Sequence, residues 1–490
     1  MNTVKVIVKV VEDNSGIFTE IPVLIDTQSR IVKPLFDFIL RLKRAGKSSS
    51  TLNKYIHATR LLLDYMAANG DIFDSPQSLF ETFTSRLYTG TIGDDGLDPS
   101  GLYWLPLSAR VARHHILSLT HLTDWLVETN GSKILNPLVK ADNYGQRLNY
   151  AAWYRKNHYN FLGHIKDKHI NSTVHQLRSV IGKRTFNTNS QDAIEFPEIH
   201  FNNFYFNGLG ASKDYRVALR DRLILILMHG GGLRESEALH LWIEDVLIDP
   251  FDFKTVRVHI FHPEFGKAPN NWKSVNGQTT RAAYLRERFV LNPRNDLIGK
   301  KRVGWKNRLT DSVDGYLIVN WFPPIFGEIF LQLWQDYIRS LANVDRHHPY
   351  AFISFHSKTY GQAYTLNAFN YNYAQGLKRI GLPPSKANGL SPHSHRHSYA
   401  RRLRRCGVGE LEIKKCLHHA SLESQQIYTT PSAKEVTNIL KNTFINLDQN
   451  CESGIQVQSW HALLEQGFSD IDPQGLFSGK SPKLGQFNEV

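Results

Sequence analysis

The sequence predicts an α+β protein, mainly α-helical with a small β-sheet, in which a helical domain precedes a mixed domain. Apolar residues recur at helical spacing between about residues 33 and 130. After residue 211, helical patterns alternate with short apolar strands. With 490 residues the chain is long enough for two or three domains, and its 41% hydrophobic and 21% charged residues are typical of a globular protein.

The first element, at residues 1–27, is predicted to be a strand pair. Val4, Val6, Val8 and Val10 occupy alternate positions, as they do on a strand with one buried face. Lysines at positions 5 and 9 interrupt this apolar run, so the segment is predicted to be a strand rather than a secretory signal peptide.

Residues 28–130 are predicted to form a small helical domain. A first helix is expected to end at Gly46, and a second helix to begin with Ser50 as its N-cap. A third, longer helix is predicted over Ala109–Val127, where apolar residues recur on one side.

Residues 131–210 show no clear periodicity and are predicted to be a linker or an inserted segment. Basic and aromatic residues are interleaved there, for example Arg147, Tyr150 and Trp153. Such a mixture can follow a phosphate backbone and stack on bases. A surface segment with its own small core is the competing interpretation.

Regular patterns return in residues 211–445, the predicted mixed domain. An apolar helix at Leu223–Met228 leads into a run of three glycines. Strands are predicted at Val256–Phe261 and Leu317–Phe322, and two amphipathic helices follow the second strand.

The bulk composition narrows the class of partner and the compartment. A net charge of +13 favours a polyanionic partner, with nucleic acid as the first candidate. Three cysteines without a CxxC pair argue against a disulfide framework and against a thiolate zinc site, and for a reducing compartment. No segment approaches the ~18 uninterrupted apolar residues of a membrane-spanning helix. We therefore expect a cytoplasmic protein.

Three separate segments hold chemically useful residues at short spacing. In the first, Arg234 follows the three glycines at the start of a helix. In the second, His393 and Arg396 lie three residues apart, on one face of a helix. The third contains His419 and, nine positions later, Tyr428. A guanidinium can neutralise a phosphate while an imidazole moves a proton.

Each segment alone has an ordinary explanation. Arg234 could form a surface ion pair, and Tyr428 could be one of the many packing tyrosines among the 20 in the chain. His393 and His395 could instead bind a metal, as in a metal-dependent nuclease. Such histidine pairs usually flank a bulky apolar residue, whereas Ser394 stands here and no carboxylate cluster is near in sequence. We therefore expect no metal site.

Taken together, the three segments resemble the tyrosine recombinase, or phage integrase, family. Its members share a G-L-R-x-S-E arginine box, an H-x-x-R-H box, and L-G-H followed nine residues later by a nucleophilic tyrosine. Gly232–Glu237 matches the first box, His393–His397 the second, and Leu417–His419 with Tyr428 the third, in the order of the family. The resemblance covers roughly residues 33–130 and 211–435.

The chain departs from this pattern at three places. His418 stands where the family usually has glycine, and His395 where it usually has an aliphatic residue. The stretch between the first two boxes is unusually long, and in the family it carries a catalytic lysine on a β-hairpin turn. Lys306 is our first choice for that lysine, with Lys273 and Lys267 as alternatives.

The resemblance implies a fold and a chemistry. It implies a core-binding (SAM-like) domain at 28–130 and a catalytic domain at 211–445, clamped around duplex DNA. Tyr428 would attack a phosphodiester and form a 3′-phosphotyrosine, without metal, ATP or another cofactor. Arg234 and Arg396 would hold the non-bridging oxygens, and the lysine would protonate the leaving 5′ oxygen. The two histidines would serve as a hydrogen-bond donor (His419) and a proton-transfer group (His393).

The implied function is site-specific recombination, or integration, of a mobile genetic element. Arg401, Arg402, Lys267 and Lys273 are expected to contact DNA phosphates. Family members act as homotetramers on two DNA sites, and accessory proteins can take part. An apolar patch in the tail, residues 446–490, could dock on a neighbouring subunit or cover its own domain. Type IB topoisomerases, telomere resolvases and catalytically inactive DNA-binding accessory proteins are the alternative functions.

Overall fold

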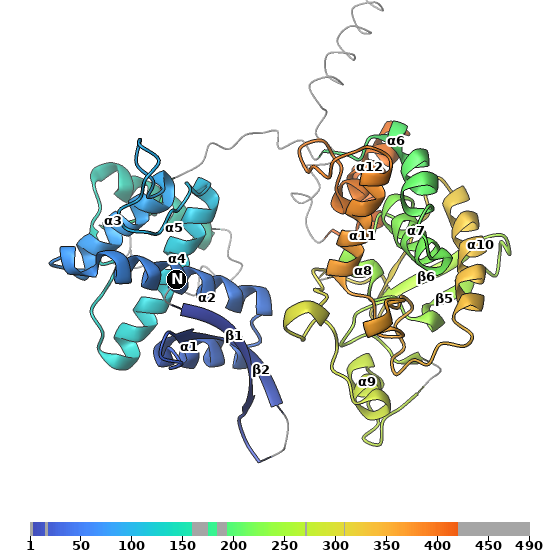
Figure 1. Cartoon of the computed structure of the whole chain (residues 1–490), viewed down its shortest axis with the longest axis horizontal. Coiled ribbons are helices and arrows are strands. Elements are labelled where there is room, and N and C mark those ends of the chain that lie inside the picture. The colour runs from blue at the N-terminus through green and yellow to red at the C-terminus, as the bar shows by residue number, and fades with distance from the viewer. Residues whose placement is uncertain are drawn as a thin grey trace, which may run out of the picture.

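The computed structural model describes most of the chain up to His419. The described residues are 3–14, 18–158, 175–183, 194–269, 272–307 and 309–419. The predictions for Tyr428 and for the tail at residues 446–490 lie outside them. Figure 1 shows two groups of elements, which we call the N-terminal lobe (residues 3–183) and the C-terminal lobe (residues 194–419).

The N-terminal lobe begins with a β-hairpin and continues with helices. Its elements are β1 (Thr3–Val11), β2 (Phe18–Asp26), α1 (Lys33–Arg44), α2 (Ser49–Asn69), a 3-10 turn (Gly70–Ile72), α3 (Pro76–Thr89), α4 (Ala109–Asn130), β3 (Leu138–Lys140), α5 (Asn143–His158) and β4 (Gln176–Arg178). The alternating valines do lie on an antiparallel pair, in which Val6 is opposite Val23. Gly46, at φ 70°, ends α1 as predicted, because glycine adopts this left-handed conformation without strain.

The N-cap of α2 differs from the prediction. Ser48, not Ser50, caps the helix, and its side chain accepts a hydrogen bond from the Thr51 backbone N–H. Three serines stand in a row here, and only Ser48 has the extended backbone that a cap requires. One face of α1 and α2 then packs on the hairpin, with Leu24, Phe38 and Ile56 in a common core.

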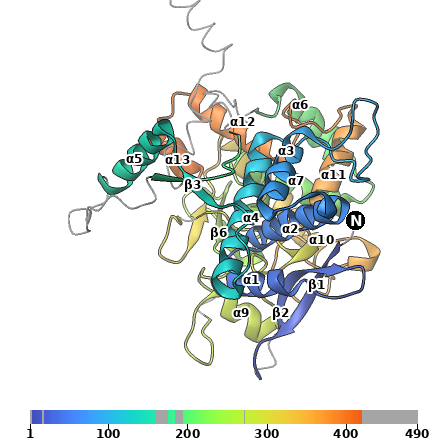
Figure 2. The same cartoon turned by 90° about the vertical axis from the view of Figure 1, so that its left-hand side faces the viewer.

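The predicted linker at 131–210 is divided between the two lobes, which corrects that interpretation. Leu135 and Val180 pack against the N-terminal core, and β3 pairs with β4 beside α5. By contrast, Phe196 and Phe204 are fully buried in the C-terminal core. These apolar side chains are buried against different lobes, so the connection between the cores is shorter than the sequence indicated. In the view of Figure 2, α5 extends beyond the rest of its lobe.

The C-terminal lobe is a helical assembly with a small sheet. Its helices and strands are α6 (Glu198–Asn203), a π-helical turn (Phe204–Leu209), α7 (Tyr215–His229), α8 (Glu235–Ala238), β5 (Val246–Ile248), β6 (Val256–Phe261), α9 (Arg281–Phe289), β7 (Tyr316–Ile318), α10 (Ile325–Ser340), α11 (Leu366–Arg379), α12 (Pro392–Arg405) and α13 (Glu410–Cys416). Short 3-10 turns lie at Ile243–Asp245, Gly299–Lys301 and Ser357–Thr359.

The C-terminal core is built around α7. The second half of this helix is apolar on all sides, and Leu223–Met228 are buried because α10, α11 and α12 surround it (Figure 1). β5, β6 and β7 form an antiparallel sheet in that order. β7 is shorter than the predicted strand because the Trp321 ring N–H, rather than a backbone N–H, donates to the Val256 carbonyl (2.9 Å).

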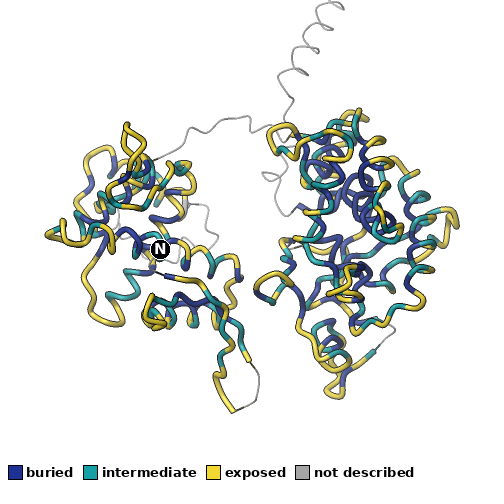
Figure 3. Tube along the Cα trace, in the orientation of Figure 1, coloured by how far each residue is buried: buried dark blue, intermediate teal, exposed yellow. Residues whose placement is uncertain are grey.

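The two lobes have separate buried cores, which Figure 3 shows as two dark regions. They touch where Lys43 Nζ lies 2.7 Å from Asp296 Oδ1. Within the described part of the chain, no helix combines the length and apolar character that a membrane span needs.

Candidate active site

A tight turn between α7 and α8 places Arg234. Gly232 has φ 69°, and a Cβ there would lie 2.5 Å from the Tyr399 ring of α12. Because no side chain intervenes, the turn packs directly on α12. Arg234 therefore becomes the N-cap of α8 and lies on the side of α12 that carries His393 and Arg396.

Glu237 is the centre of the site. Its side chain is fully buried and accepts hydrogen bonds from both the backbone N–H (2.9 Å) and the guanidinium of Arg234. Arg396 Nη1 lies 3.6 Å from Glu237 Oε2, and Asn307 Nδ2 donates to Glu237 Oε1 at 2.8 Å. Burial raises the pKa of Glu237, but Arg396 and Arg234 outweigh burial and hold the pKa below its ordinary value. One ionised carboxylate thus orients two arginines.

Glu237 is not among the predicted site residues, although it stands in the arginine box. The signal was available, because an arginine and a glutamate three residues apart at a helix start form a local ion pair. Asn307 gave no signal, because it is 70 residues from Glu237 and on an irregular segment.

Arg396 links the three predicted segments. Its side chain is 1% exposed, and Nη1 donates to the Gly232 carbonyl (2.6 Å). Nη2 bonds the Leu417 carbonyl and lies 3.1 Å from His419 Nε2. The first box, the second box and the segment after α13 are therefore fixed to one guanidinium.

The two predicted histidines lie among these arginines. His393 remains exposed to solvent, whereas His419 is buried. Partial desolvation, Arg396 and Arg234 lower the pKa of His393 to about 4, and burial with the same two arginines lowers the pKa of His419 to about 3. Both rings are therefore neutral at neutral pH, so each can exchange a proton with a bound group.

Lys306 lies at the site, as the first choice for the lysine required. It is exposed and is the neighbour of Asn307, and its charge acts on His393 and on Glu235. Lys267 instead pairs with Asp314 at 3.5 Å, and Lys273 lies on an exposed turn. The catalytic role of Lys306 stays a prediction.

Arg401 and Arg402 do not present the exposed phosphate-binding surface that was predicted. Arg401 is 5% exposed. The Arg402 side chain is 15% exposed, and its guanidinium bonds Glu198 (2.7 Å), His229 and the Phe322 carbonyl. Because Arg401 is buried and the donors of Arg402 are used inside the lobe, the structure argues against a DNA-contact role for these two residues.

A buried histidine pair lies behind the site. His395 Nδ1 is 3.0 Å from His229 Nδ1, and His395 Nε2 is 2.9 Å from the Tyr373 hydroxyl. Both rings are fully buried, and Phe196 stacks on His395 at 4.2 Å. The sequence marked His395 as a departure, but its partner is 166 residues away and could not be identified. The pair fastens α12 to α7.

Because of the buried pair His229–His395, we expect the folded state to lose stability as the pH falls. Burial lowers the pKa of both rings well below 6.5. Each contribution to stability is thus present above pH 6.5 and is lost as the pH falls below it, because only the unfolded chain takes up the protons. The loss is at most about 1.4 kcal/mol per histidine for each pH unit.

We expect His395→Leu to reduce the loss of unfolding free energy between pH 7.5 and pH 5.5, measured by urea denaturation. His347→Leu is the control, because the His347 side chain is 89% exposed and lies outside the buried pair. An unchanged pH dependence in His395→Leu would contradict this interpretation.

The predicted nucleophile and metal ligands complete the comparison with the sequence. Tyr428 lies outside the described residues, which end at His419. Among the described residues, no group of three or more histidine, cysteine, aspartate or glutamate side chains is arranged to hold a metal ion. His395, the second candidate metal ligand, faces His229 rather than His393.

The chain is similar to a transposon protein. Transposase A from transposon Tn554 of Staphylococcus aureus is 21% identical over 408 residues, which are 82% of this chain and 88% of that protein. No family model matches the chain.

Solved structures with similarity to the chain include two kinds of DNA complex. The XerH site-specific recombinase bound to difH substrate has a TM-score of 0.43 and 16% identity, over 79% of this chain and 78% of that one. The Tn1549 transposon integrase in complex with transposon right end DNA has a TM-score of 0.38 and 12% identity, over 76% of this chain and 86% of that one. At such TM-scores the overlays transfer no residue position to this chain.

Proposed function

We propose that the chain is a tyrosine site-specific DNA recombinase of a mobile genetic element, which cleaves and rejoins DNA through a 3′-phosphotyrosine at Tyr428. The observation that carries the proposal is the convergence of Arg234 and Arg396 on Glu237, with His393 and His419 beside them. The similarity to transposase A from Tn554 supports an origin in a mobile element.

The reaction is a transesterification. The Tyr428 oxygen forms a bond to phosphorus, the bond from phosphorus to the 5′ oxygen breaks, and that oxygen leaves as a hydroxyl. The energy of the phosphodiester is kept in the phosphotyrosine, so a 5′ hydroxyl of another strand can reverse the step. No nucleotide cofactor is needed for this exchange.

Positive charge at the site stabilises the transition state, in which the non-bridging oxygens carry extra negative charge. The Arg234 side chain is 19% exposed while Glu237 holds it, so a phosphate can reach its guanidinium. Arg396 is buried beside Glu237, where it adds its positive charge and keeps His419 in place. Because Glu237 and the carbonyls fix both arginines beforehand, little reorganisation is needed when DNA binds.

Proton transfer is assigned to His393 and Lys306. The neutral ring of His393 can accept the proton of the Tyr428 hydroxyl, whose ordinary pKa of about 10 is too high for unaided attack. A bound phosphate offsets the charges of the arginines and so raises the pKa of His393 towards its ordinary range. Lys306 is exposed beside His393 and supplies the proton to the leaving 5′ oxygen.

The partners of this enzyme are duplex DNA and further copies of the chain. The net charge of +13 suits a DNA-binding protein, and Lys267 and Lys273, on the C-terminal lobe, are candidate phosphate contacts. We propose a core-binding domain at 28–130, a catalytic domain at 211–445, and a homotetramer on paired DNA sites. Docking between subunits is assigned to the tail at 446–490, and accessory proteins can join the assembly.

A nicked suicide substrate tests the proposed function. When DNA from the ends of the element carries a nick beside the cleavage site, the short fragment diffuses away and the covalent complex is trapped. We expect a covalent protein–DNA complex on a denaturing gel, in equal amount with and without EDTA. The same duplex without the nick is the control and should trap little, because rejoining competes. Cleavage that requires a divalent metal, or that leaves the DNA unattached, would refute the proposal.

A further inference from the structure

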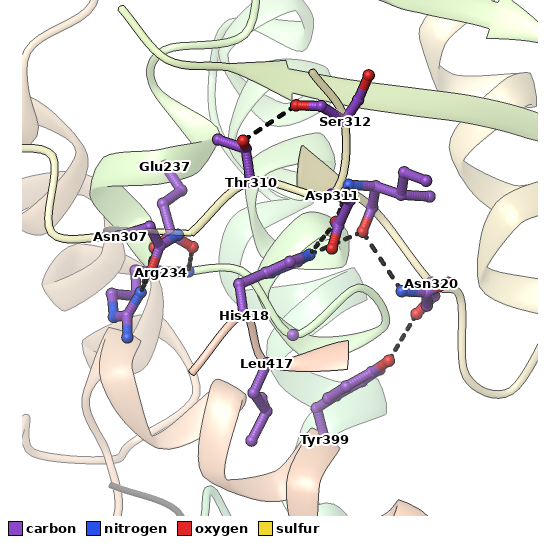
Figure 4. Close-up of polar contacts among 12 residues, drawn as sticks. Arg234, Glu237, Asn307, Thr310, Asp311, Ser312, Asn320, Tyr399, Leu417 and His418 are labelled. Carbon is purple, nitrogen blue, oxygen red and sulfur yellow. Dashed lines mark hydrogen bonds and ion pairs between the residues drawn. The ribbon is translucent and has the colours of Figure 1, made fainter. Parts of the chain in front are cut away.

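One short segment contacts both halves of the proposed site. Residues 307–312, of which 308 lies outside the described residues, follow the exposed Lys306 and precede β7, which begins at Tyr316. We call them the bridging segment. In Figure 4 its two ends approach different parts of the site, with Asn307 beside Arg234 and Asp311 beside His418.

The first contact is made by Asn307, which is 9% exposed. Its side-chain oxygen accepts a hydrogen bond from the Arg234 guanidinium, and its Nδ2 donates to Glu237 Oε1 at 2.8 Å. The amide thus lies between the arginine and the carboxylate, with its acceptor towards the cation and its donor towards the anion. The same contact fixes the backbone position of Lys306, which precedes Asn307 in the chain.

The second contact is made by Asp311. Its Oδ2 lies 3.0 Å from His418 Nε2 and accepts a hydrogen bond from the Ile318 backbone N–H of β7 at 2.7 Å. His418 Nε2 is also 3.1 Å from the Ile318 carbonyl, so it faces two acceptors and must carry a proton. The side chains of His418 and Asp311 are 1% and 15% exposed, so the contact is shielded from water.

The contact with Asp311 holds the backbone of His418 in an unfavourable conformation. Its φ of 53° is left-handed, a conformation that costs a residue with a side chain roughly 1–2 kcal/mol and that glycine adopts freely. The contacts of the His418 ring with Asp311 and with the Ile318 carbonyl of β7 offset this cost. The next residue, His419, lies 3.1 Å from Arg396 Nη2, so the position of His418 also sets the position of His419.

We propose that Asn307, Asp311 and His418 are positioning residues, which hold Lys306 and His419 in register on the two sides of the scissile phosphate. The inference rests on the proposed function. Neither Asp311 nor His418 touches the reacting atoms, and both act through their neighbours. Loss of the Asp311–His418 contact releases His418 and His419 from β7 without removing either arginine of the site.

Three variants test the contact: Asp311→Ala, Asp311→Asn and His418→Gly. We expect Asp311→Ala and His418→Gly to lower the single-turnover rate of covalent complex formation by about 10-fold, since small displacements of catalytic groups are costly. Asp311→Asn keeps one acceptor oxygen, so its rate should lie between those of the other two variants and that of the wild type. The double variant should be no slower than the slower single variant, because both remove the same contact.

Binding and folding are measured beside the rate. The Kd for DNA should stay within about 2-fold of the wild-type value, and His418→Gly should melt no earlier, because glycine relieves the left-handed backbone. Asp345→Ala is the matched control, because it breaks a His–Asp pair whose side chains are 89% and 86% exposed. It should leave the rate unchanged.

The outcomes separate this inference from the proposed function. Wild-type rates in both His418→Gly and Asp311→Asn would overturn the positioning role while leaving the recombinase intact. Multiplying effects in the double variant would also overturn it. Absence of a covalent complex with the wild-type protein would instead remove the proposed function, and the inference with it.

Discussion

Tyr428→Phe is expected to bind the DNA ends as tightly as the wild-type protein and to form no covalent complex with them. The substitution removes one oxygen, the proposed nucleophile, and leaves Arg234 and Arg396, which pair with Glu237, in place. We expect cleavage to fall by about 10⁴-fold or more, the scale of loss seen when a catalytic nucleophile is removed. Gel shifts measure binding, and denaturing gels measure the covalent complex on the suicide substrate.

Tyr371→Phe is the matched control for this prediction. Tyr371 is 65% exposed on α11, and loss of its hydroxyl should change neither binding nor cleavage. A covalent adduct formed by Tyr428→Phe would show that another residue is the nucleophile.

Arg396→Lys is expected to slow cleavage by about 10²-fold, the scale of loss when catalytic groups are displaced by about 1 Å. A lysine keeps the charge, but its compact ammonium cannot contact Gly232, Leu417 and His419 together as the planar guanidinium does. The affinity for DNA should change little, because the charge is retained. Single-turnover cleavage and DNA binding, measured on the same preparation, check this result.

Lysine is the informative substitution at this position. Arg396→Ala is less informative, because it would also destabilise the fold. Alanine would leave Glu237, which is fully buried, without one of its two cations, a change that typically costs about 3–5 kcal/mol. Arg339→Lys, on the exposed surface of α10, is the control and should cleave normally. Normal cleavage by Arg396→Lys would refute the role of the guanidinium.

Local sequence patterns predicted the helices and strands, but not which of them pack against one another. The alternating valines and the helical spacing of apolar residues indicated the hairpin and most helices, because burial of one face leaves a period in the sequence. Local patterns could not place residues 131–210, because all three tyrosines of α5 are exposed and the helix therefore has no apolar stripe. The buried phenylalanines that join the C-terminal core follow only later.

The site shows the same division. The spacing within each box placed His393 and Arg396 on one helical face, and the resemblance brought the boxes together. Contacts over long distances in sequence left no trace, as with Arg402, whose partners Glu198 and His229 are 204 and 173 residues away. A run of arginines has the same sequence whether it faces DNA or carboxylates of its own lobe. The sequence could not rank the three candidate lysines, whereas the structure shows that the charge of Lys306 acts on His393.

The most direct test of the account is to map the protein–DNA bond itself. The trapped complex is digested with trypsin and a nuclease, and the peptide that carries a nucleotide is sequenced by mass spectrometry. The account predicts a single modified peptide, with the 3′ phosphate of the DNA esterified to Tyr428. A bond to any other residue, or through a 5′ phosphate, would contradict it.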